Sequence, residues 1–325
     1  MKNVKILVTD TIVHRMPDIT AEKYPEENAH IEWVLAETGD EEELVRLVKD
    51  VDIIVGARHN IKTKILENAD KVSFIQQCSA GYDNLDLDTA RKKSITVSHS
   101  GSAGIIPVAE LVMTLMLSAA RSIPKCHNSM ANGEWIFPEM INKTYEVNAK
   151  TLGIIGMGKI GTQTATLANG LQMKIQYFDP YRKDTSDLDF PAKSVSLEEL
   201  LKTSDFISIH TLMTDETFHM IGKNELEMMK PTAYLINTSR GSICDEDALA
   251  DALENNVIAG AGLDVFGGHH EPPSEGAKIL KLDNVVLTPH IGGATAEDIY
   301  RNFFVTSLDN IIRVIRGEEP LYIVS

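Results

Sequence analysis

The sequence predicts an α/β protein with two doubly wound parallel sheets, and two observations carry that prediction. Short apolar runs alternate with helix-compatible segments along the chain, as they do where helices connect the strands of a parallel sheet. In the middle of the chain, a glycine-rich turn directly follows the apolar run Leu152–Ile155. A chain of 325 residues is long enough for two domains of ordinary size.

The first hundred residues form one alternating unit. Four apolar runs in it have the length and composition of buried strands: Val4–Val8, Ile31–Ala36, Val51–Val55 and Val72–Gln76. Between the second and third runs, Asp40–Lys49 begins with acidic residues and has basic residues near its end, as the helix dipole favours. Val4–Val8 is followed by Thr9, Asp10 and Thr11, so this unit has no glycine-rich turn.

The segment from Thr151 to Asp179 has the order strand, glycine turn, helix, strand and acid, which is the order of a dinucleotide-binding unit. In its turn, Gly156 permits the tight bend, Gly158 lets the backbone approach a pyrophosphate, and Gly161 lets the helix pack close to the sheet. The N-terminus of that helix then presents N–H groups and a positive dipole end to the phosphates.

Asp179 stands eighteen residues after Gly161, at the end of the second strand of this unit. Its carboxylate is placed to accept hydrogen bonds from both adenosine ribose hydroxyls and to repel a 2′-phosphate, which favours NAD over NADP. Arg182 and Lys183 follow closely and would soften that repulsion. The alternative, a glycine-rich turn in a helix–sheet protein that binds no nucleotide, stays open.

The remaining elements fit the same plan. Apolar residues occupy all sides of Ile105–Arg121, so this helix is expected to be buried all round, at a domain or subunit junction. Lys125–Lys150 is less regular and is expected to form an extended arm. Thr295–Arg316 has apolar residues near helical spacing and is predicted as a long closing helix. Four further strands are expected: Phe206–Thr211, Ala233–Thr238, Ile258–Val265 and Val285–Leu287.

Charge and cysteine content argue against several kinds of partner. The formal charge of -16 makes nucleic acid or an anionic membrane surface an unfavourable partner. The N-terminus has no long apolar stretch and no run reaches membrane-spanning length, so a soluble cytoplasmic protein is expected. Cys78, Cys126 and Cys244 lack the spacing of a zinc site or a disulfide framework, which fits a reducing cytosol.

Three candidate catalytic residues follow successive predicted strands, at the edge where open α/β sheets collect their ligands: Arg240, Glu271 and His290. An arginine binds a carboxylate through two parallel hydrogen bonds and polarises the adjoining carbonyl. A histidine gives a proton to that carbonyl oxygen, or takes it back, as hydride is transferred. A glutamate holds the imidazole and stabilises its protonated form. The set fits redox chemistry between a 2-hydroxy acid and a 2-keto acid.

Six motifs resemble, in order and separation, those of the D-isomer-specific 2-hydroxyacid dehydrogenases, which include phosphoglycerate and glycerate dehydrogenases. The motifs are SAGYDNLD (79–86), VAELVMTLMLSAAR (108–121), GMGKIG…YFDPYRK, NTSRG, GLDVF…EP and TPHIGG. The resemblance implies a Rossmann NAD-binding domain over residues 102–296, inserted into a flavodoxin-like substrate domain formed by residues 1–101 and 297–325. It also implies catalytic roles for Arg240, Glu271 and His290, and a homodimer joined around the long helix.

The resemblance further implies which residues bind the ligands. The expected NAD-binding residues are Gly156, Gly158, Lys159, Ile160, Gly161, Asp179, His210, Thr211, Thr217, Thr238, Ser239, Arg240, Asp264, His290, Gly292 and Gly293. The expected substrate-binding residues are Arg58, Ser79, Ala80, Gly81 and Arg240, with the backbone of residues 79–81 at the substrate carboxylate. The expected partner is a small 2-keto or 2-hydroxy acid, and no metal is expected.

The chain departs from the family pattern in three places. Four residues, Gly267–His270, separate DVF from Glu271 where the family usually has two. His99-Ser100-Gly101 stands where Asn-x-Pro is usual, and Leu212 stands where proline is frequent. His269, His270 and Glu271 also suggest a metal site, but adjacent histidines lack the spacing of a rigid helical site and no third strong ligand is visible.

The sequence therefore predicts an NAD-dependent D-2-hydroxyacid dehydrogenase with His290 as its acid and base. One alternative is a formate or phosphite dehydrogenase of the same superfamily, although formate dehydrogenases carry glutamine in place of Glu271. A second is a non-catalytic NAD(H)-sensing protein like the C-terminal-binding corepressors, which keep all three catalytic residue types. A non-catalytic role also stays open for each of the three residues. Arg240 would then be an ion-paired surface arginine, His290 a histidine of the core, and Glu271 a solvated acid in a loop.

Overall fold

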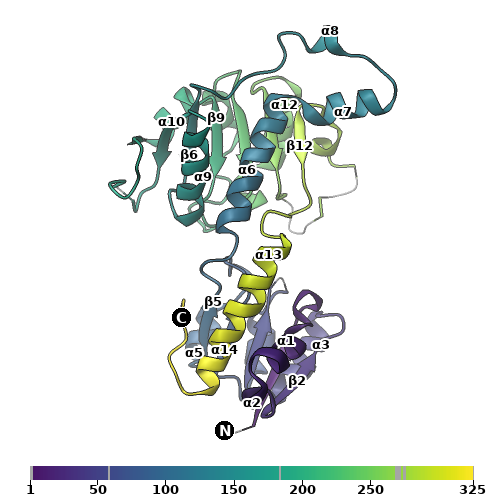
Figure 1. Cartoon of the computed structure of the whole chain (residues 1–325), viewed down its shortest axis with the longest axis vertical. Helices are drawn as coiled ribbons and strands as arrows, with labels where there is room; N and C mark the ends of the chain where they lie inside the picture. Colours follow the sequence, from purple (N-terminus) through teal and green to yellow (C-terminus); the bar gives the residue numbers. More distant parts are fainter. Residues whose placement is uncertain (1–2, 58, 183, 268–271, 274–275, 325) are drawn as a thin grey trace. The chain divides into compact units, whose positions relative to one another are not determined.

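Two compact units make up the chain (Figure 1). The computed structural model describes residues 3–57, 59–182, 184–267, 272–273 and 276–324. Unit 1 comprises Met1–Gly104 and Thr295–Ser325, and unit 2, Ile105–Ala294, is inserted between these two parts. Every strand pairing in the two sheets is parallel among the residues that are described, which confirms the predicted fold class.

The sheet of unit 1 has the strand order β2-β1-β3-β4-β5, which is the flavodoxin-like order. Its strands are β1 (Val4–Val8), β2 (Ile31–Leu35), β3 (Ile53–Gly56), β4 (Phe74–Gln77) and β5 (Thr96–His99). The first four match the predicted runs to within two residues, whereas β5 was not predicted. Three of its four residues, Thr96, Ser98 and His99, are polar, so it lacks the apolar run on which the strand predictions rested.

Both faces of this sheet are covered, which is why β1 is apolar without alternation. Ile6 and Val8 pack in one buried cluster with Leu308, whereas Leu7 points to the opposite face and packs with Leu44. The helices of the Leu44 face are α3 (Glu41–Leu47), α4 (Thr63–Glu67) and α5 (Leu87–Lys92). The helices of the Leu308 face are α1 (Met16–Lys23) and α14 (Ser307–Ile315), with the short α2 (Pro25–Asn28) beside α1.

Unit 2 contains a seven-stranded sheet in the order β12-β11-β10-β9-β6-β7-β8. Its strands are β6 (Thr151–Ile155), β7 (Lys174–Phe178), β8 (Ala192–Ser194), β9 (Phe206–Ile209), β10 (Tyr234–Asn237), β11 (Gly260–Leu263) and β12 (Val285–Leu287). The chain leaves β6 toward one edge and returns to continue from β9 toward the other, so β6 and β9 flank a topological switch point. Ligands of open α/β sheets bind outside the carboxyl ends of the strands at such a point.

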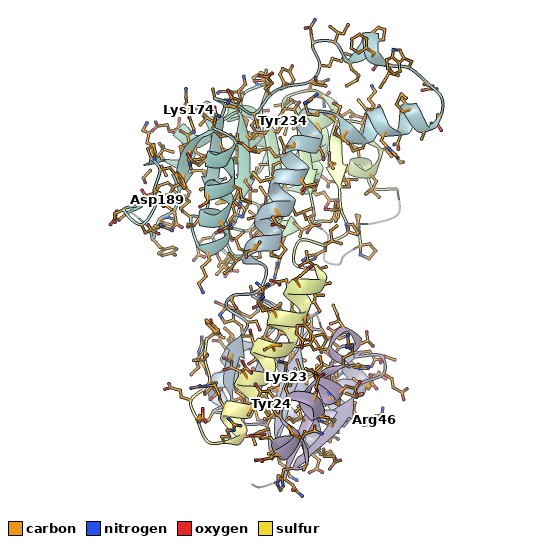
Figure 2. All side chains as sticks on the ribbon, viewed as in Figure 1. Lys23, Tyr24, Arg46, Lys174, Asp189 and Tyr234 are labelled. Carbon is orange, nitrogen blue, oxygen red and sulfur yellow. The ribbon has the colours of Figure 1, made fainter. Side chains whose placement is uncertain are left out.

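Helices pack on both faces of this sheet (Figure 1). One face carries α6 (Ile105–Ala120) and α9 (Lys159–Gly170), and the other carries α10 (Leu197–Thr203), α11 (Lys223–Met228) and α12 (Glu246–Glu254). Tyr234 of β10 lies on the α6 face (Figure 2). Its ring stacks on Phe206 of β9 with 5.3 Å between ring centroids. Burial there raises the pKa of Tyr234 to about 12.

The helix α6 is not buried all round within the single chain, and its predicted burial at a subunit junction stays a prediction. Ile106, Glu110, Thr114 and Leu117 lie on one exposed stripe, and the side chain of Ile106 is 49% exposed. Beyond it, α7 (Ile123–Ala131) and α8 (Phe137–Met140) form an arm that projects from the sheet (Figure 1). In the described part of the chain, no single helix is long and apolar enough to cross a bilayer. The 65°-bent pair of α6 and α7 meets that criterion by length and composition alone.

The closing helix forms at the predicted position, but it is not a regular α-helix throughout. It begins with α13 (Ala296–Asp298), continues as a π-helix over Ile299–Thr306 and ends as α14. Side-chain hydroxyls account for the wider turns: Ser100 and Ser307 both donate to the carbonyl oxygen of Asn302, at 3.1 and 3.2 Å. Such hydroxyl donors compete with the regular backbone ladder, and apolar spacing alone does not predict them.

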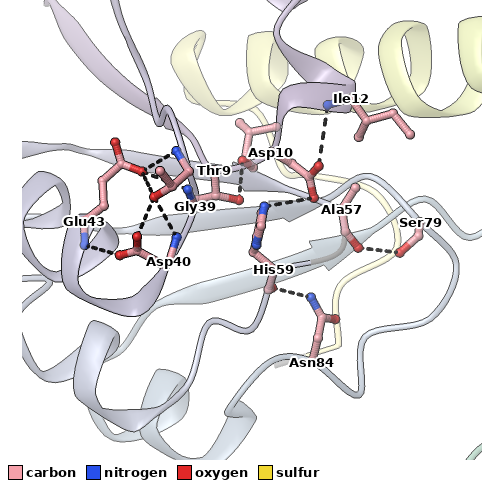
Figure 3. A network of polar contacts seen from close by, with 12 residues as sticks. Thr9, Asp10, Ile12, Gly39, Asp40, Glu43, Ala57, His59, Ser79 and Asn84 are labelled. Atoms are coloured by element: carbon pink, nitrogen blue, oxygen red, sulfur yellow. Dashed lines mark hydrogen bonds and ion pairs between the residues drawn. The ribbon is translucent and has the colours of Figure 1, made fainter. Parts of the chain in front are cut away.

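A single carboxylate closes the turn that follows β2. Glu43 of α3 accepts hydrogen bonds from the backbone N–H groups of Glu37, Thr38 and Gly39, at 2.9, 2.8 and 2.8 Å (Figure 3). Burial would raise the pKa of Glu43, but these three amides and the Thr38 hydroxyl outweigh it and lower the pKa to about 2. The ring of His59 packs directly against Gly39, where an added Cβ would lie 2.5 Å from its Nε2 atom.

Replacing Glu43 with glutamine should lower the free energy of unfolding by about 1–3 kcal/mol at pH 7, because three backbone amides lose a charged acceptor. A lowered folded-state pKa stabilises the fold above the unfolded carboxyl pKa of about 4.3 and loses that contribution toward pH 2. The difference between wild type and variant should therefore be constant from pH 7 to about 5 and shrink below. Urea unfolding across this range measures it, with the exposed Glu42→Gln as the control. Equal losses in both variants would contradict the role of Glu43.

Candidate cofactor and active site

The glycine turn after β6 has the contacts that a dinucleotide turn requires. Gly156 has a φ of +92°, and an added Cβ would lie 2.8 Å from the carbonyl carbon of His210. At Gly161 an added Cβ would lie 2.2 Å from the carbonyl oxygen of Gly156, so α9 packs against the turn through a bare backbone. Gly158 lies in open space, where a ligand can approach its backbone. Lys159 and Ile160 begin α9, whose first N–H groups have no partner within the helix.

Asp179 follows β7 and ties its end to the glycine turn. One carboxylate oxygen accepts from the Met157 N–H at 2.8 Å, and the other accepts from the N–H groups of Tyr181 and Arg182 at 2.8 and 3.1 Å. These three amides fix the orientation of the carboxylate beside Gly158. The sequence pattern predicts the acid at this position but not its bonds to the backbone.

The guanidinium of Arg182 lies next to Asp179 and donates to four groups, one of them the Asp184 carbonyl at 3.1 Å. It donates to both carboxylate oxygens of Asp187 at 2.5 and 2.7 Å, to the Met157 carbonyl at 2.9 Å and to the Thr162 hydroxyl at 2.6 Å. These bonds place the arginine charge against an acid of its own chain. Lys183 lies outside the described residues.

An open hollow of about 620 Å³ lies at this end of unit 2. Its lining residues come from the start of α6, the glycine turn, the start of α9 and the loop after β7: Ile105, Met157, Gly158, Lys159, Thr162, Asp179, Tyr181, Arg182 and Asp187. An acid, a helix N-terminus and an accessible glycine backbone border one cavity. This combination fits the adenosine diphosphate half of a dinucleotide.

The turns after β9 and β10 border the same carboxyl edge. His210 follows β9, and its Nε2 lies 2.9 Å from the Ser208 hydroxyl. Burial lowers the pKa of His210 to about 4, so its imidazole is neutral at pH 7. The Ser239 hydroxyl donates to the Thr211 carbonyl, which links the two turns. In the Leu212–Thr217 loop, the Thr217 hydroxyl donates to the Leu212 carbonyl at 2.7 Å.

The hydroxyl oxygen of Thr238 is buried and has no hydrogen-bond partner in the described part of the chain. A buried hydroxyl without a partner is costly in a folded protein. Thr238 follows β10 at the ligand edge, so a polar group of a bound cofactor would satisfy it. The buried hydroxyl of Thr238 therefore fits its expected role as a cofactor contact.

Arg240 follows β10 on a turn that Asn237 organises. The buried Asn237 donates through Nδ2 to the Arg240 carbonyl at 2.9 Å and accepts through Oδ1 from the Ser239 N–H at 3.0 Å. Gly241 comes next, and an added Cβ there would lie 1.8 Å from the carbonyl carbon of Phe266. The turn after β10 therefore touches the one after β11. Sequence reasoning missed Asn237, although it begins the NTSRG motif.

His290 lies on a strained turn that the carboxylate of Asp264 holds. Asp264 follows β11 and is 1% exposed; its Oδ1 accepts from the Thr288 hydroxyl at 2.6 Å and the Ile291 N–H at 2.8 Å. Its Oδ2 accepts from the Gly292 N–H at 2.8 Å. His290 has a φ of +54°, which is unfavourable for a residue with a Cβ, and its side chain is exposed. The backbone is thus fixed on both sides of an accessible imidazole.

Unit 1 carries the expected substrate turn after β4. The Gln77 side chain donates from Nε2 to the Ser79 hydroxyl at 2.8 Å and to the Gly81 carbonyl at 3.1 Å, and the Ser79 hydroxyl donates to that carbonyl at 2.9 Å. Near it, at the switch point between β1 and β3, His59 Nε2 lies 4.0 Å from the buried carboxylate of Asp10 (Figure 3).

Some predicted site residues lie outside the described residues. These are Arg58, which was expected to bind substrate, and Glu271, which was expected to hold the imidazole, together with His269 and His270 of the metal alternative. Within the described ranges, no three histidine, cysteine, aspartate or glutamate side chains gather as a metal site would require.

Comparison with known proteins adds the family. The sequence model "D-isomer specific 2-hydroxyacid dehydrogenase, NAD binding domain" matches residues 113–292. A glyoxylate reductase of Thermococcus litoralis is 41% identical over 283 residues, which cover 85% of this chain and 84% of that protein. A hydroxypyruvate reductase of Thermotoga maritima is 38% identical over 267 residues, which cover 81% and 85%.

A solved structure has the same fold over almost the whole chain. The acyclic imino acid reductase Bsp5, in complex with NADPH and D-Arg, superposes with a TM-score of 0.86 at 28% identity, covering 99% of this chain and 100% of that one. The family match, the relatives and the fold agree with the resemblance that the motifs indicated. The chain belongs to the D-isomer-specific 2-hydroxyacid dehydrogenase family and uses a nicotinamide dinucleotide cofactor.

Proposed function

We propose that this protein reduces a small 2-keto acid, of the size of glyoxylate or hydroxypyruvate, to the D-2-hydroxy acid with NADH, and catalyses the reverse oxidation. The observation that carries the proposal is the carboxyl edge of unit 2. There, three neighbouring strands place Arg240, Asp264 and His290 on turns that are joined by hydrogen bonds or backbone contact. Relatives that are 38–41% identical are named for glyoxylate and hydroxypyruvate.

A bound nicotinamide supplies the hydride that reaches the carbonyl carbon. Arg240 binds the substrate carboxylate with two parallel hydrogen bonds and polarises the carbonyl next to it. His290 gives its proton to the carbonyl oxygen as that oxygen gains the electron pair of the broken C=O π bond, so the product is an alcohol. Glu271 stabilises the protonated imidazole, and Arg58 contacts the substrate tail. The backbone of Ser79–Gly81 binds the substrate carboxylate.

The cofactor contacts follow the same assignment. Gly156, Gly158 and Gly161, with Lys159 and Ile160, bind the pyrophosphate, and Asp179 binds the adenosine ribose. The remaining contacts come from the turns after β9 to β12: His210, Thr211, Thr217, Thr238, Ser239, Arg240, Asp264, His290, Gly292 and Gly293.

The working form in this proposal is a homodimer in the cytoplasm. Support for the dimer comes from the arm after α6, where Trp135 and Phe137 are 73% and 62% exposed and Ile123, Met130 and Ile141 are each more than half exposed. Several large apolar side chains exposed on one short segment favour a protein partner. For the compartment, Cys78, Cys126 and Cys244 are free thiols, as a reducing cytosol favours. Burial also raises the pKa of Cys78 and Cys244 to about 12, so both are unreactive.

An optical NADH-oxidation assay tests the proposed function. The panel contains glyoxylate, hydroxypyruvate, pyruvate, branched and aromatic 2-keto acids and phosphohydroxypyruvate, with formate and phosphite assayed in the NAD-reducing direction. Turnover of a small 2-keto acid is the expected result. Activity confined to formate or phosphite would instead support the formate/phosphite branch. NADH binding without any turnover would support the NAD(H)-sensing alternative. The glyoxylate and hydroxypyruvate reductases among the relatives favour neither of these two outcomes.

His290→Ala should lower kcat for keto acid reduction by roughly 10²-fold or more, because the general acid is lost. The KM for NADH should change little. His30→Ala is the matched control and should keep wild-type kinetics. His30 directly precedes β2, at the amino ends of the strands of unit 1 and away from their carboxyl ends. Near-normal turnover by His290→Ala would remove His290 from the mechanism.

Asp264→Asn should lower kcat/KM by roughly 10- to 100-fold, equivalent to about 1.4–2.8 kcal/mol, because the amide cannot accept from all three donors of the His290 turn. Near-ultraviolet circular dichroism should show a retained fold. Asp283→Asn, at an exposed position before β12, serves as the control. An unchanged kcat/KM in Asp264→Asn would show that the turn holds without this carboxylate.

NADH should exceed NADPH in kcat/KM by at least about tenfold, or roughly 1.4 kcal/mol, because a 2′-phosphate would meet the fixed carboxylate of Asp179. Asp179→Asn should shrink the ratio, mainly by weakening NADH. Asp187→Ala should shrink it too, by releasing the Arg182 guanidinium toward the phosphate. Paired KM and kcat measurements with both cofactors decide this. Equal use of the two cofactors by the wild type would show that Asp179 does not govern the site.

A further inference from the structure

The Ser79–Gly81 turn has all three of its carbonyl oxygens bound to the protein. The Ser79 carbonyl accepts from the Ser100 N–H at 3.2 Å, and the Gly81 carbonyl accepts from the Ser79 hydroxyl at 2.9 Å. The Ala80 carbonyl accepts from Nδ1 of His99 at 2.8 Å. A carbonyl oxygen can only accept, so His99 carries its proton on Nδ1.

Anchoring these carbonyls decides where the amides point. In a trans peptide the C=O and the N–H lie on opposite sides of the bond, so fixing the Ala80 carbonyl also fixes the Gly81 N–H. None of the N–H groups of Ser79, Ala80 and Gly81 has a hydrogen-bond partner among the described residues. The Gly81 N–H therefore points away from the Ala80–His99 bond, and the three amides of the turn can bind an anion.

The ring of His99 is held between two tyrosines. Tyr82 and Tyr322 meet it edge to face, with centroid distances of 5.2 and 6.1 Å. Tyr322 also lies over Gly101, where an added Cβ would come within 2.6 Å of the ring. The two tyrosines thus limit the rotation of the imidazole that reaches Ala80.

The C-terminal segment Leu321–Val324 brings Tyr322 to this place. It pairs with β5: His99 N–H donates to the Tyr322 carbonyl at 3.2 Å, and the Val324 N–H donates to the Val97 carbonyl at 2.9 Å. The buried Asn310 of α14 fixes the segment from behind, donating to the Leu321 carbonyl at 2.9 Å and accepting from its N–H at 2.6 Å. A chain of contacts therefore runs from α14 through Tyr322 and His99 to Ala80.

We propose that His99, held by Tyr322 of the C-terminal segment, is a positioning residue that orients the amides of Ser79–Gly81 toward the substrate carboxylate. The inference rests on the proposed function for its kinetic consequence. The position is one of the three where the chain departs from its family, which usually has asparagine there. Asparagine Nδ2, like histidine Nδ1, is bonded to Cγ, so both side chains can donate to the Ala80 carbonyl.

Two substitutions separate the donor from the ring. His99→Phe keeps an aromatic ring and removes the donor, whereas His99→Asn keeps a donor and removes the ring. Losing one hydrogen bond of this kind should raise the KM for the keto acid roughly three- to tenfold in His99→Phe. Because the carboxylate is bound equally in ground and transition states, kcat should change less than about twofold. His99→Asn should stay within about twofold of the wild-type KM, and neither variant should change the KM for NADH.

A second measurement does not depend on activity. Hydrogen exchange of the Ser100 amide, which donates to the Ser79 carbonyl, should speed up roughly three- to tenfold in His99→Phe and remain slow in His99→Asn. His30→Phe and His30→Asn are the matched controls. If the wild type reduced no 2-keto acid, the proposed function would fall, while exchange would still test the anchoring of the turn.

Two results with the His99 variants would overturn the proposal. A wild-type KM and wild-type exchange in His99→Phe would overturn the proposal, and so would equal effects of His99→Phe and His99→Asn. If His99→Phe fails to fold in a thermal melt, Tyr322→Leu replaces it, because the backbone pairing of the segment survives. That variant should raise the keto acid KM roughly two- to fourfold with the NADH KM unchanged, and a wild-type keto acid KM would count against the proposal.

Discussion

The buried carboxylate of Asp264 is the contact on which the active edge depends. It accepts three hydrogen bonds from the turn after β12, and it does so from the end of β11, the neighbouring strand. A left-handed backbone at His290 costs free energy that a surface loop would release by relaxing. Here Asp264 binds donors of Thr288, Ile291 and Gly292, which flank the histidine on both sides. The backbone of His290 is therefore fixed while its imidazole stays accessible.

The same arrangement recurs at other carboxyl ends in both sheets. A polar side chain near the strand end binds the backbone of a turn: the buried Gln77 at the end of β4, the buried Asn237 at the end of β10, and the half-buried Glu43 opposite the turn after β2. Strands buried on both faces leave few positions for polar atoms except at their ends. Buried polar groups demand partners, and the turns supply them with free N–H and C=O groups. Rigid turns at the ligand edge follow from this demand.

Sequence pattern predicts the layers well because apolar runs and glycine turns are local signals. It placed β6, the Gly156–Gly161 turn and the acid at residue 179, and it placed Arg240 and His290 at strand ends. It missed β5 and β8, which are short and partly polar, and it expected α6 to be covered on every side. It gave no sign that Asn237 binds Arg240, or that His99 binds Ala80. Such contacts depend on side-chain geometry, and for His99 and Ala80 also on which strands become neighbours, which spacing along the chain does not encode.

The insertion of unit 2 between the two parts of unit 1 has a consequence for synthesis on the ribosome. Unit 2 is contiguous, so all its residues are available once Ala294 has been made. Unit 1 is not, since the face of its sheet formed by Ile6 and Val8 is completed by Leu308 and Ile311 of α14. The part of that apolar face which α14 covers stays exposed while nearly two hundred residues of unit 2 emerge. All residues of the nucleotide-binding unit are therefore available before those of unit 1. The strands of unit 1 are synthesised first, but α14, which packs on them, is synthesised last.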